Sequence, residues 1–75
     1  MFGIFYVTED KPLILGTSSG EPLWFDTLDE TIEFIQVFDI EVCDDTVIWR
    51  IIGDFLLDEY NASKIRSLLA ARVVS

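Results

Sequence analysis

The 75-residue sequence has no histidine, a single cysteine and only five basic residues. Without histidine, the chain lacks the side chain best suited to proton transfer near neutral pH. Cys43 has no second cysteine for a disulfide within the chain, which is typical of a reducing compartment. No apolar run approaches the roughly 18–20 residues that cross a bilayer, and no signal-peptide pattern opens the chain. We therefore expect one small cytoplasmic domain spanning residues 1–75.

The residues that could carry chemistry lack the partners that such chemistry needs. Cys43 stands among acidic residues, which do not favour the thiolate that a nucleophile requires. Residues 16–22 lack the lysine of a phosphate-binding loop and do not open directly onto a helix. Neither residues 9–10 nor residues 44–45 belong to a calcium-loop pattern with alternating ligands and a closing glutamate. The sequence predicts a protein that is not an enzyme and has no catalytic, cofactor-binding or metal-binding residue.

Fourteen acidic residues against five basic ones give a formal net charge of −9. Residues 1–63 contain all the acids but only Lys11 and Arg50 among the bases, whereas residues 64–75 contain three bases and no acid. Direct nucleic-acid binding requires Lys and Arg on one face, and an anionic membrane attracts the same residues, so both partners are disfavoured. The acidity fits a basic protein surface as partner. It fits equally well a role in keeping a 51% hydrophobic domain soluble.

The segment from Trp24 to Asp39 has the pattern of an amphipathic helix. Asp26 and Thr27 are alternative N-caps, and Thr27 with Glu30 matches a capping box. At about 100° per residue, one face of this helix is apolar. The side chains expected on it are Leu28, Thr31, Ile32, Phe34, Ile35 and Phe38. Acidic residues fill much of the other face, where Val37 is out of place.

Aromatic and β-branched segments around this helix predict strands at residues 2–7, 13–15, 40–43 and 46–52. The first two form an expected hairpin, and residues 23–25 are either a short strand or the approach to the helix. After Gly53, Asp54 can cap a helix. Asn61 can end that helix and begin another, although a single helix over residues 54–72 is the alternative. The apolar stripe of the last helix would be Ile65, Leu68, Leu69 and Val73.

These elements predict one α+β domain in the order β-β-α-β-β-α. It would have a small antiparallel sheet of three or four strands, packed by the amphipathic helix and a C-terminal helix. Both faces of strands 2–7 and 46–52 are apolar, so both need a cover. The C-terminal helix would cover the second face or pack beside the first helix. If it does neither, the second face is a surface for a homodimer.

The stretch from Leu15 to Ile35 resembles a segment of small plasmid partition-associated proteins, the ParC-like family. The resemblance is carried by Gly20-Glu21-Pro22, then an aromatic residue, and then Thr27-Leu28-Asp29 at the start of an amphipathic helix. In this sequence Leu23, Trp24 and Asp26 stand where basic residues are expected in that family. The resemblance implies an origin on a mobile genetic element.

Two functions are compatible with these features. The first is a small phage- or plasmid-encoded inhibitor of anti-CRISPR or anti-restriction type, whose acidic surface mimics DNA and occupies the basic nucleic-acid-binding groove of a host protein. Its partner-binding residues would be Asp26, Asp29, Glu30, Glu33, Glu41, Asp44, Asp45, Asp54, Asp58, Glu59 and Trp24. For Trp24, packing within the fold is about as common a fate as exposure in an interface. The second function is a partition-associated or antitoxin-like accessory module that forms an oligomer through surplus apolar surface.

Overall fold

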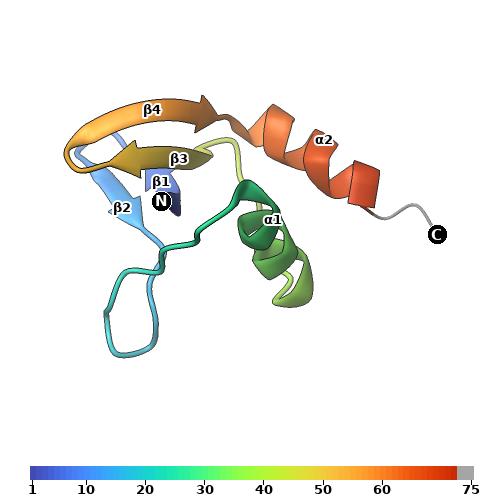
Figure 1. Cartoon of the computed structure of the whole chain (residues 1–75), viewed down its shortest axis with the longest axis horizontal. Coiled ribbons are helices and arrows are strands. Elements are labelled where there is room, and N and C mark those ends of the chain that lie inside the picture. The colour runs from blue at the N-terminus through green and yellow to red at the C-terminus, as the bar shows by residue number, and fades with distance from the viewer. Residues whose placement is uncertain (73–75) are drawn as a thin grey trace.

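The computed structural model describes residues 1–72 (Figure 1). Its elements are β1 (Phe2–Val7), β2 (Pro12–Ile14), α1 (Leu28–Val37), β3 (Thr46–Ile52), β4 (Phe55–Tyr60) and α2 (Ala62–Arg72). The four strands form one antiparallel sheet in the order β2-β1-β3-β4. The α+β class and the order β-β-α-β-β-α are confirmed. The strand predicted at residues 46–52 is confirmed as β3, whereas the one predicted at residues 40–43 does not form and β4 lies where a helix was predicted.

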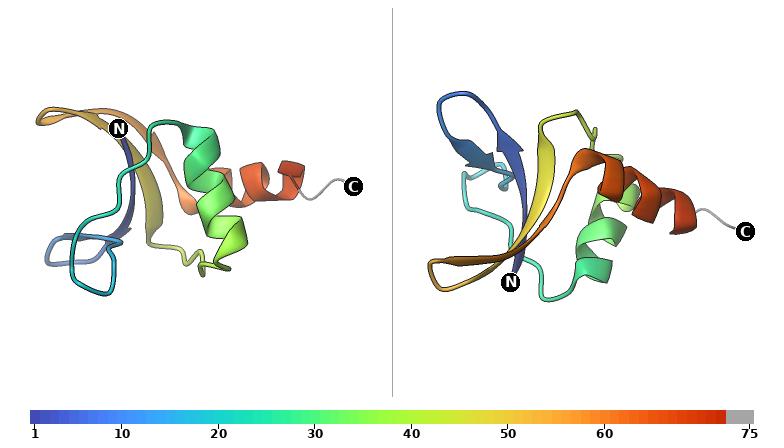
Figure 2. Two further views of the ribbon diagram at one scale, coloured as in Figure 1. Left: turned by 60° about the horizontal axis from the view of Figure 1, so that its bottom comes forward. Right: turned by 90° about the horizontal axis from the view of Figure 1, so that it is seen from above.

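Both helices lie on one side of the sheet, so α2 packs beside α1 (Figure 2). Isoleucines from β1, α1, β3 and α2 meet in the space between the helices and the sheet. They are Ile4, Ile32, Ile35, Ile48 and Ile65, and each is at most 2% exposed. Burying one such side chain fully contributes about 1.5–3 kcal/mol. This one-sided core holds α1 in a fixed position over β1.

Helix α1 begins as predicted, because Thr27 is its N-cap and the Thr27 hydroxyl accepts from the Glu30 amide at 3.1 Å. The Glu30 carboxylate accepts from the Asp26 amide, at 3.3 Å, and not from Thr27 as a reciprocal capping box requires. The helix ends in a Schellman motif, in which the Ile40 amide donates to the Ile35 carbonyl at 2.9 Å and Asp39 has a positive φ of 51°.

Residues 55–60 form the strand β4 and not a helix, and Asp54 lies in the turn before it, which corrects the sequence prediction. Gly53 has φ 61° and stands first in a two-residue turn that pairs Ile52 with Phe55. This turn sends the chain back along β3 as β4, with a bulge opposite the Arg50–Ile51 step. Asn61 then caps α2, since its Oδ1 accepts from the Lys64 amide at 2.9 Å. The second of the two predicted helices is therefore confirmed.

Residues 40–43 form a loop and not a strand, which is a second correction. The amide of Cys43 donates to the Thr46 hydroxyl at 2.9 Å, and the Val42 carbonyl accepts from Arg66 at 2.9 Å. Both edges of the adjacent strand β3 are already paired, with β1 and with β4. The strand that follows this segment therefore has no free edge for it to pair with. Within the predicted apolar stripe of α2, Ile65 is buried and Leu68 and Leu69 are half-buried, while Val73 lies outside the described residues.

The sheet face away from the helices, here called the outer sheet face, carries an aromatic cluster. The Phe5 ring centroid lies 4.6 Å from that of Trp49 and 6.1 Å from that of Trp24. Trp24 comes from the segment between β2 and α1, where isolated bridges join Phe2 to Phe25 and residue 16 to residue 22. A Cβ at Gly3 would lie 3.0 Å from Trp24 Cζ3, so the absence of a side chain there makes room for the indole.

Candidate binding surface

Four acidic residues lie at the start of α1: three share one side of the helix, because positions three and four apart on a helix lie on one side, and the fourth precedes the Thr27 N-cap. They are Asp26, Asp29, Glu30 and Glu33, and all four are exposed. This group, called here the α1 acidic face, contains four of the predicted partner-binding residues. Asp29 differs from the others because its Oδ1 accepts from Arg72 Nη1 at 2.6 Å. The structure therefore brings these four predicted residues together.

A row of three phenylalanine rings borders the α1 acidic face. The Phe25 and Phe34 ring centroids are 5.2 Å apart, and those of Phe34 and Phe38 are 4.5 Å apart. Together they form the aromatic row. Its last ring is exposed to solvent, since Phe38 is 63% exposed. Its exposure corrects the prediction that Phe38 is on the buried face. Phe38 is the C-cap of α1, with φ −94° and ψ 5°, and so leaves the helical periodicity.

A shallow hollow of about 300 Å³ lies along the aromatic row. Its lining combines the three rings and one aliphatic side chain with two carboxylates, and consists of Phe25, Phe34, Phe38, Val37, Glu30 and Glu33. Val37 is 67% exposed, so two large apolar side chains stand in solvent at this end of α1. The sequence carried a partial signal for the hollow, since Val37 was the apolar residue on the acidic side of the helix. The aromatic residues of the hollow were not predicted as binding residues.

The remaining predicted acids lie elsewhere. Glu41, Asp44 and Asp45 are exposed in the loop before β3, and Asp44 pairs with Arg66 at 3.3 Å. Asp54 is exposed in the turn after β3. The acids of the loop before β3 and Asp54 after it are therefore separated by the whole length of this strand, which rises roughly 3.3 Å per residue.

Two neighbouring acids on β4 also point apart. Asp58 pairs with Arg50 at 3.4 Å on the helix side of the sheet, whereas Glu59 stands opposite Trp49. Successive residues of a strand point to opposite faces. The predicted acidic residues therefore do not form one continuous face.

Trp24, the predicted aromatic contact, is not part of the α1 acidic face. It is 39% exposed and packs against Phe5 on the outer sheet face. Trp49 is half-buried in the same cluster, and its Nε1 has no hydrogen-bond partner within the described part of the chain. The structure thus places the two tryptophans together, and it places phenylalanines rather than Trp24 beside the acids of α1.

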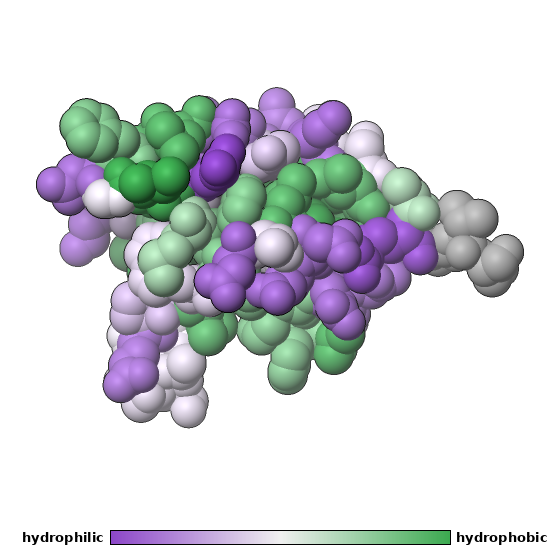
Figure 3. Space-filling view, viewed as in Figure 1, coloured by the Kyte–Doolittle hydropathy of each residue, from purple (hydrophilic) through white to green (hydrophobic). Residues whose placement is uncertain are grey.

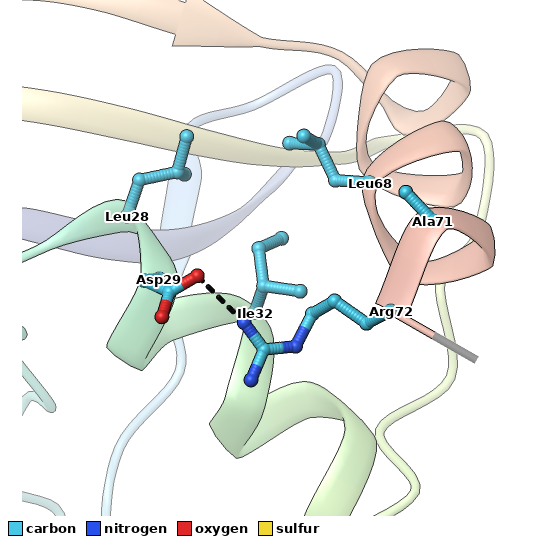
Figure 4. Close-up of a pocket in the computed structure, with 6 residues that line it drawn as sticks. All are labelled: Leu28, Asp29, Ile32, Leu68, Ala71 and Arg72. Atoms are coloured by element: carbon cyan, nitrogen blue, oxygen red, sulfur yellow. Dashed lines mark hydrogen bonds and ion pairs between the residues drawn. The ribbon is translucent and has the colours of Figure 1, made fainter. Parts of the chain in front are cut away.

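A second hollow, of about 370 Å³, lies between the two helices (Figure 4). Leu28 and Ile32 of α1 and Leu68 and Ala71 of α2 form its apolar lining. The Asp29–Arg72 ion pair bridges the two helices there. This pair ties the end of α2 to the first turn of α1, and it occupies the Asp29 carboxylate.

Most acidic side chains among residues 1–72 form no ion pair. Three ion pairs occur among residues 1–72, and each joins one arginine to one aspartate. Eleven of the fourteen acids, all of them exposed, are left outside these pairs. Exposed apolar residues add to this surface at the β3–β4 turn and at the end of α1 (Figure 3). The surface is therefore both acidic and locally apolar.

Residues 1–72 contain no group of three or more histidine, cysteine, aspartate or glutamate side chains placed to hold a metal ion. No helix in that range is long and apolar enough to cross a membrane. Comparisons with protein-family models, with curated proteins and with solved structures each find no match to this chain. The resemblance to ParC-like proteins stays a prediction. Any functional assignment must come from the surface itself.

Proposed function

We propose that this protein is a non-enzymatic binding protein that engages a basic surface on another protein. The observation that carries the proposal is the α1 acidic face beside the aromatic row. Carboxylates steer a basic partner toward the surface, and exposed rings supply the desolvated contact area that gives a complex its lifetime. An acidic face that only kept the protein soluble would have no need of an exposed Phe38.

The partner that best fits this surface is a groove built to bind DNA or RNA, because such grooves present clustered Lys and Arg. The protein would inhibit its partner by occupying the groove, as in anti-CRISPR or anti-restriction inhibition. We propose an origin on a phage or plasmid, which the resemblance of residues 15–35 to ParC-like proteins favours. The α1 acidic face and the aromatic row would contact the groove, and Asp54 and Glu59 would lie outside the contact area.

The test is capture of basic proteins from a nuclease-treated bacterial lysate on immobilised protein. We expect the immobilised protein to retain nucleic-acid-binding proteins and to release them as salt screens the charges. In the variant Asp26→Asn/Glu30→Gln/Glu33→Gln, binding of the captured protein should be about tenfold weaker. Asp29 is left intact because its ion pair holds the helices together.

The control variant Glu9→Gln/Asp10→Asn/Glu21→Gln removes the same formal charge from exposed positions outside α1. It should bind as the unmodified protein does. Equal loss of binding in both variants would mean that net charge acts without a site. Retention of nothing basic, or binding that is unchanged by salt, would contradict the proposal as a whole.

A second candidate function is self-association, and the β3–β4 turn favours it. Ile52, Phe55, Leu56 and Leu57 are 56%, 74%, 51% and 47% exposed, an apolar patch at the end of an edge strand. Edge strands with exposed apolar residues are ready to pair with another chain. The occupant we assign to this patch is a second copy of the protein. The resulting oligomer would act as an accessory module.

Light scattering at micromolar concentration tests self-association. A dimer that persists at high salt and is lost in Phe55→Lys would support it, because apolar contacts are not screened. A monomer at every concentration would exclude it. This result would leave the α1 proposal standing.

A further inference from the structure

We infer that the hollow along the aromatic row receives an arginine side chain of the partner. This inference rests on the proposed function and adds the chemistry of the residue that is recognised. The lining of the hollow has two features that a guanidinium needs, which are aromatic rings and carboxylates beside them. Glu30 and Glu33 supply the carboxylates, and Phe34 and Phe38 supply the rings.

The protein shows the same combination in an occupied form. The Arg50 guanidinium carbon lies 5.9 Å from the Phe2 ring centroid, within the range of a cation–π contact, and Arg50 Nη1 lies 3.4 Å from Asp58 Oδ2. One ring and one carboxylate therefore hold an arginine of the chain itself. The hollow on α1 has three rings and two carboxylates, and no cation among residues 1–72 pairs with either glutamate.

Arginine fits this hollow better than lysine does. A guanidinium is planar, weakly hydrated and able to stack on a ring while its N–H groups reach a carboxylate sideways. An ammonium is a compact and strongly hydrated charge that gains less from the ring faces. The shallow shape suits a protruding side chain of a protein surface. The exposed Phe38 ring and Val37 flank the place where its aliphatic stem would lie.

The experiment measures the binding of two peptide probes, octa-arginine and octa-lysine. Each is titrated into isotopically labelled protein, and the amide chemical shifts are followed by NMR. We expect octa-arginine to bind about fivefold more tightly than octa-lysine. The largest amide shifts should fall on Glu33, Phe34, Val37 and Phe38. Phe38→Ala should weaken binding of octa-arginine about threefold and leave octa-lysine nearly unchanged. Phe38→Leu, which keeps apolar bulk without a ring, should behave like Phe38→Ala.

The matched control is Phe55→Ala, because Phe55 is also a highly exposed phenylalanine but lies at the β3–β4 turn. It should leave both affinities unchanged. Equal binding of the two probes, or arginine preference that survives Phe38→Ala and Phe38→Leu, would overturn the inference. In either case binding of a basic probe would still support the proposed function. If neither probe binds at low salt, the proposed function fails with the inference.

Discussion

Tyr6 shows at the residue scale how the uneven charge acts on a single group. Tyr6 stands in β1 opposite Thr46, next to the loop that leads into β3. Burial raises the pKa of the Tyr6 phenol above its ordinary value of 10.0, and the negative charges of Cys43, Asp45 and Glu41 raise the pKa further. The phenol therefore keeps its proton in the folded protein at pH values where it loses it in the unfolded chain.

This shift predicts a loss of stability in alkaline solution. Above pH 10.0 the unfolded chain releases the Tyr6 proton while the folded protein retains it, so the free energy of unfolding falls until the raised pKa is passed. Urea unfolding between neutral pH and alkaline pH measures the decline. Tyr6→Phe should reduce the decline and remove the late phase from an absorbance titration of tyrosine. An unchanged titration in Tyr6→Phe would contradict the prediction.

At the element scale, the start of α1 depends on one side-chain oxygen. The Thr27 hydroxyl accepts from the Glu30 amide, which otherwise has no partner in the first turn. We expect Thr27→Ala to lower the free energy of unfolding by about 1 kcal/mol, measured by urea unfolding. Thr27→Ser retains the oxygen and should cost much less. Equal losses in the two variants would assign the effect to the threonine methyl group.

The elements also show what local sequence could and could not predict. The two helix caps at Thr27 and Asn61 were readable because capping involves residues only three positions apart. The strand at residues 55–60 could not be predicted in this way, since three apolar residues followed by two acids fit a helix turn and a strand equally well. Pairing with β3, which the turn at Gly53 permits, decided the outcome. The alternation in residues 40–43 is genuine, but the strand that follows this segment has no free edge for it to pair with.

The same limit applies to the binding surface. The acids of α1 could be placed on one side of a helix from spacing alone, and the structure agrees. The acids of the loops and of β4 were predicted to join those of α1, but they lie elsewhere. Their positions depend on the direction in which β3 carries the chain, which local sequence does not show. The aromatic row could not be predicted from the sequence for a similar reason. Phe25 reaches it through the bridge to Phe2, a contact between residues far apart in the sequence.

At the scale of the whole molecule, repulsion among unpaired acids opposes folding. The three surface ion pairs contribute little, whereas eleven acids outside these pairs repel one another. We expect the free energy of unfolding to rise by about 1 kcal/mol between about 0.01 and 0.15 M NaCl, as the Debye length falls from about 30 to 8 Å. Urea unfolding at each salt concentration measures this. Glu9→Gln/Asp10→Asn/Glu21→Gln should show a weaker dependence, and a fall in stability with salt would contradict the prediction.

The aromatic cluster of the outer sheet face gives the protein two optical reporters of different character. Trp49 has its Nε1 shielded from water, whereas Trp24 is 39% exposed and is held by the segment that leads directly into α1. Their fluorescence should accordingly separate into a blue component that resists quenching by iodide and a redder component that does not. Any ligand that displaces the segment before α1 would alter the redder emission first. The chain therefore needs no attached dye to report such a movement.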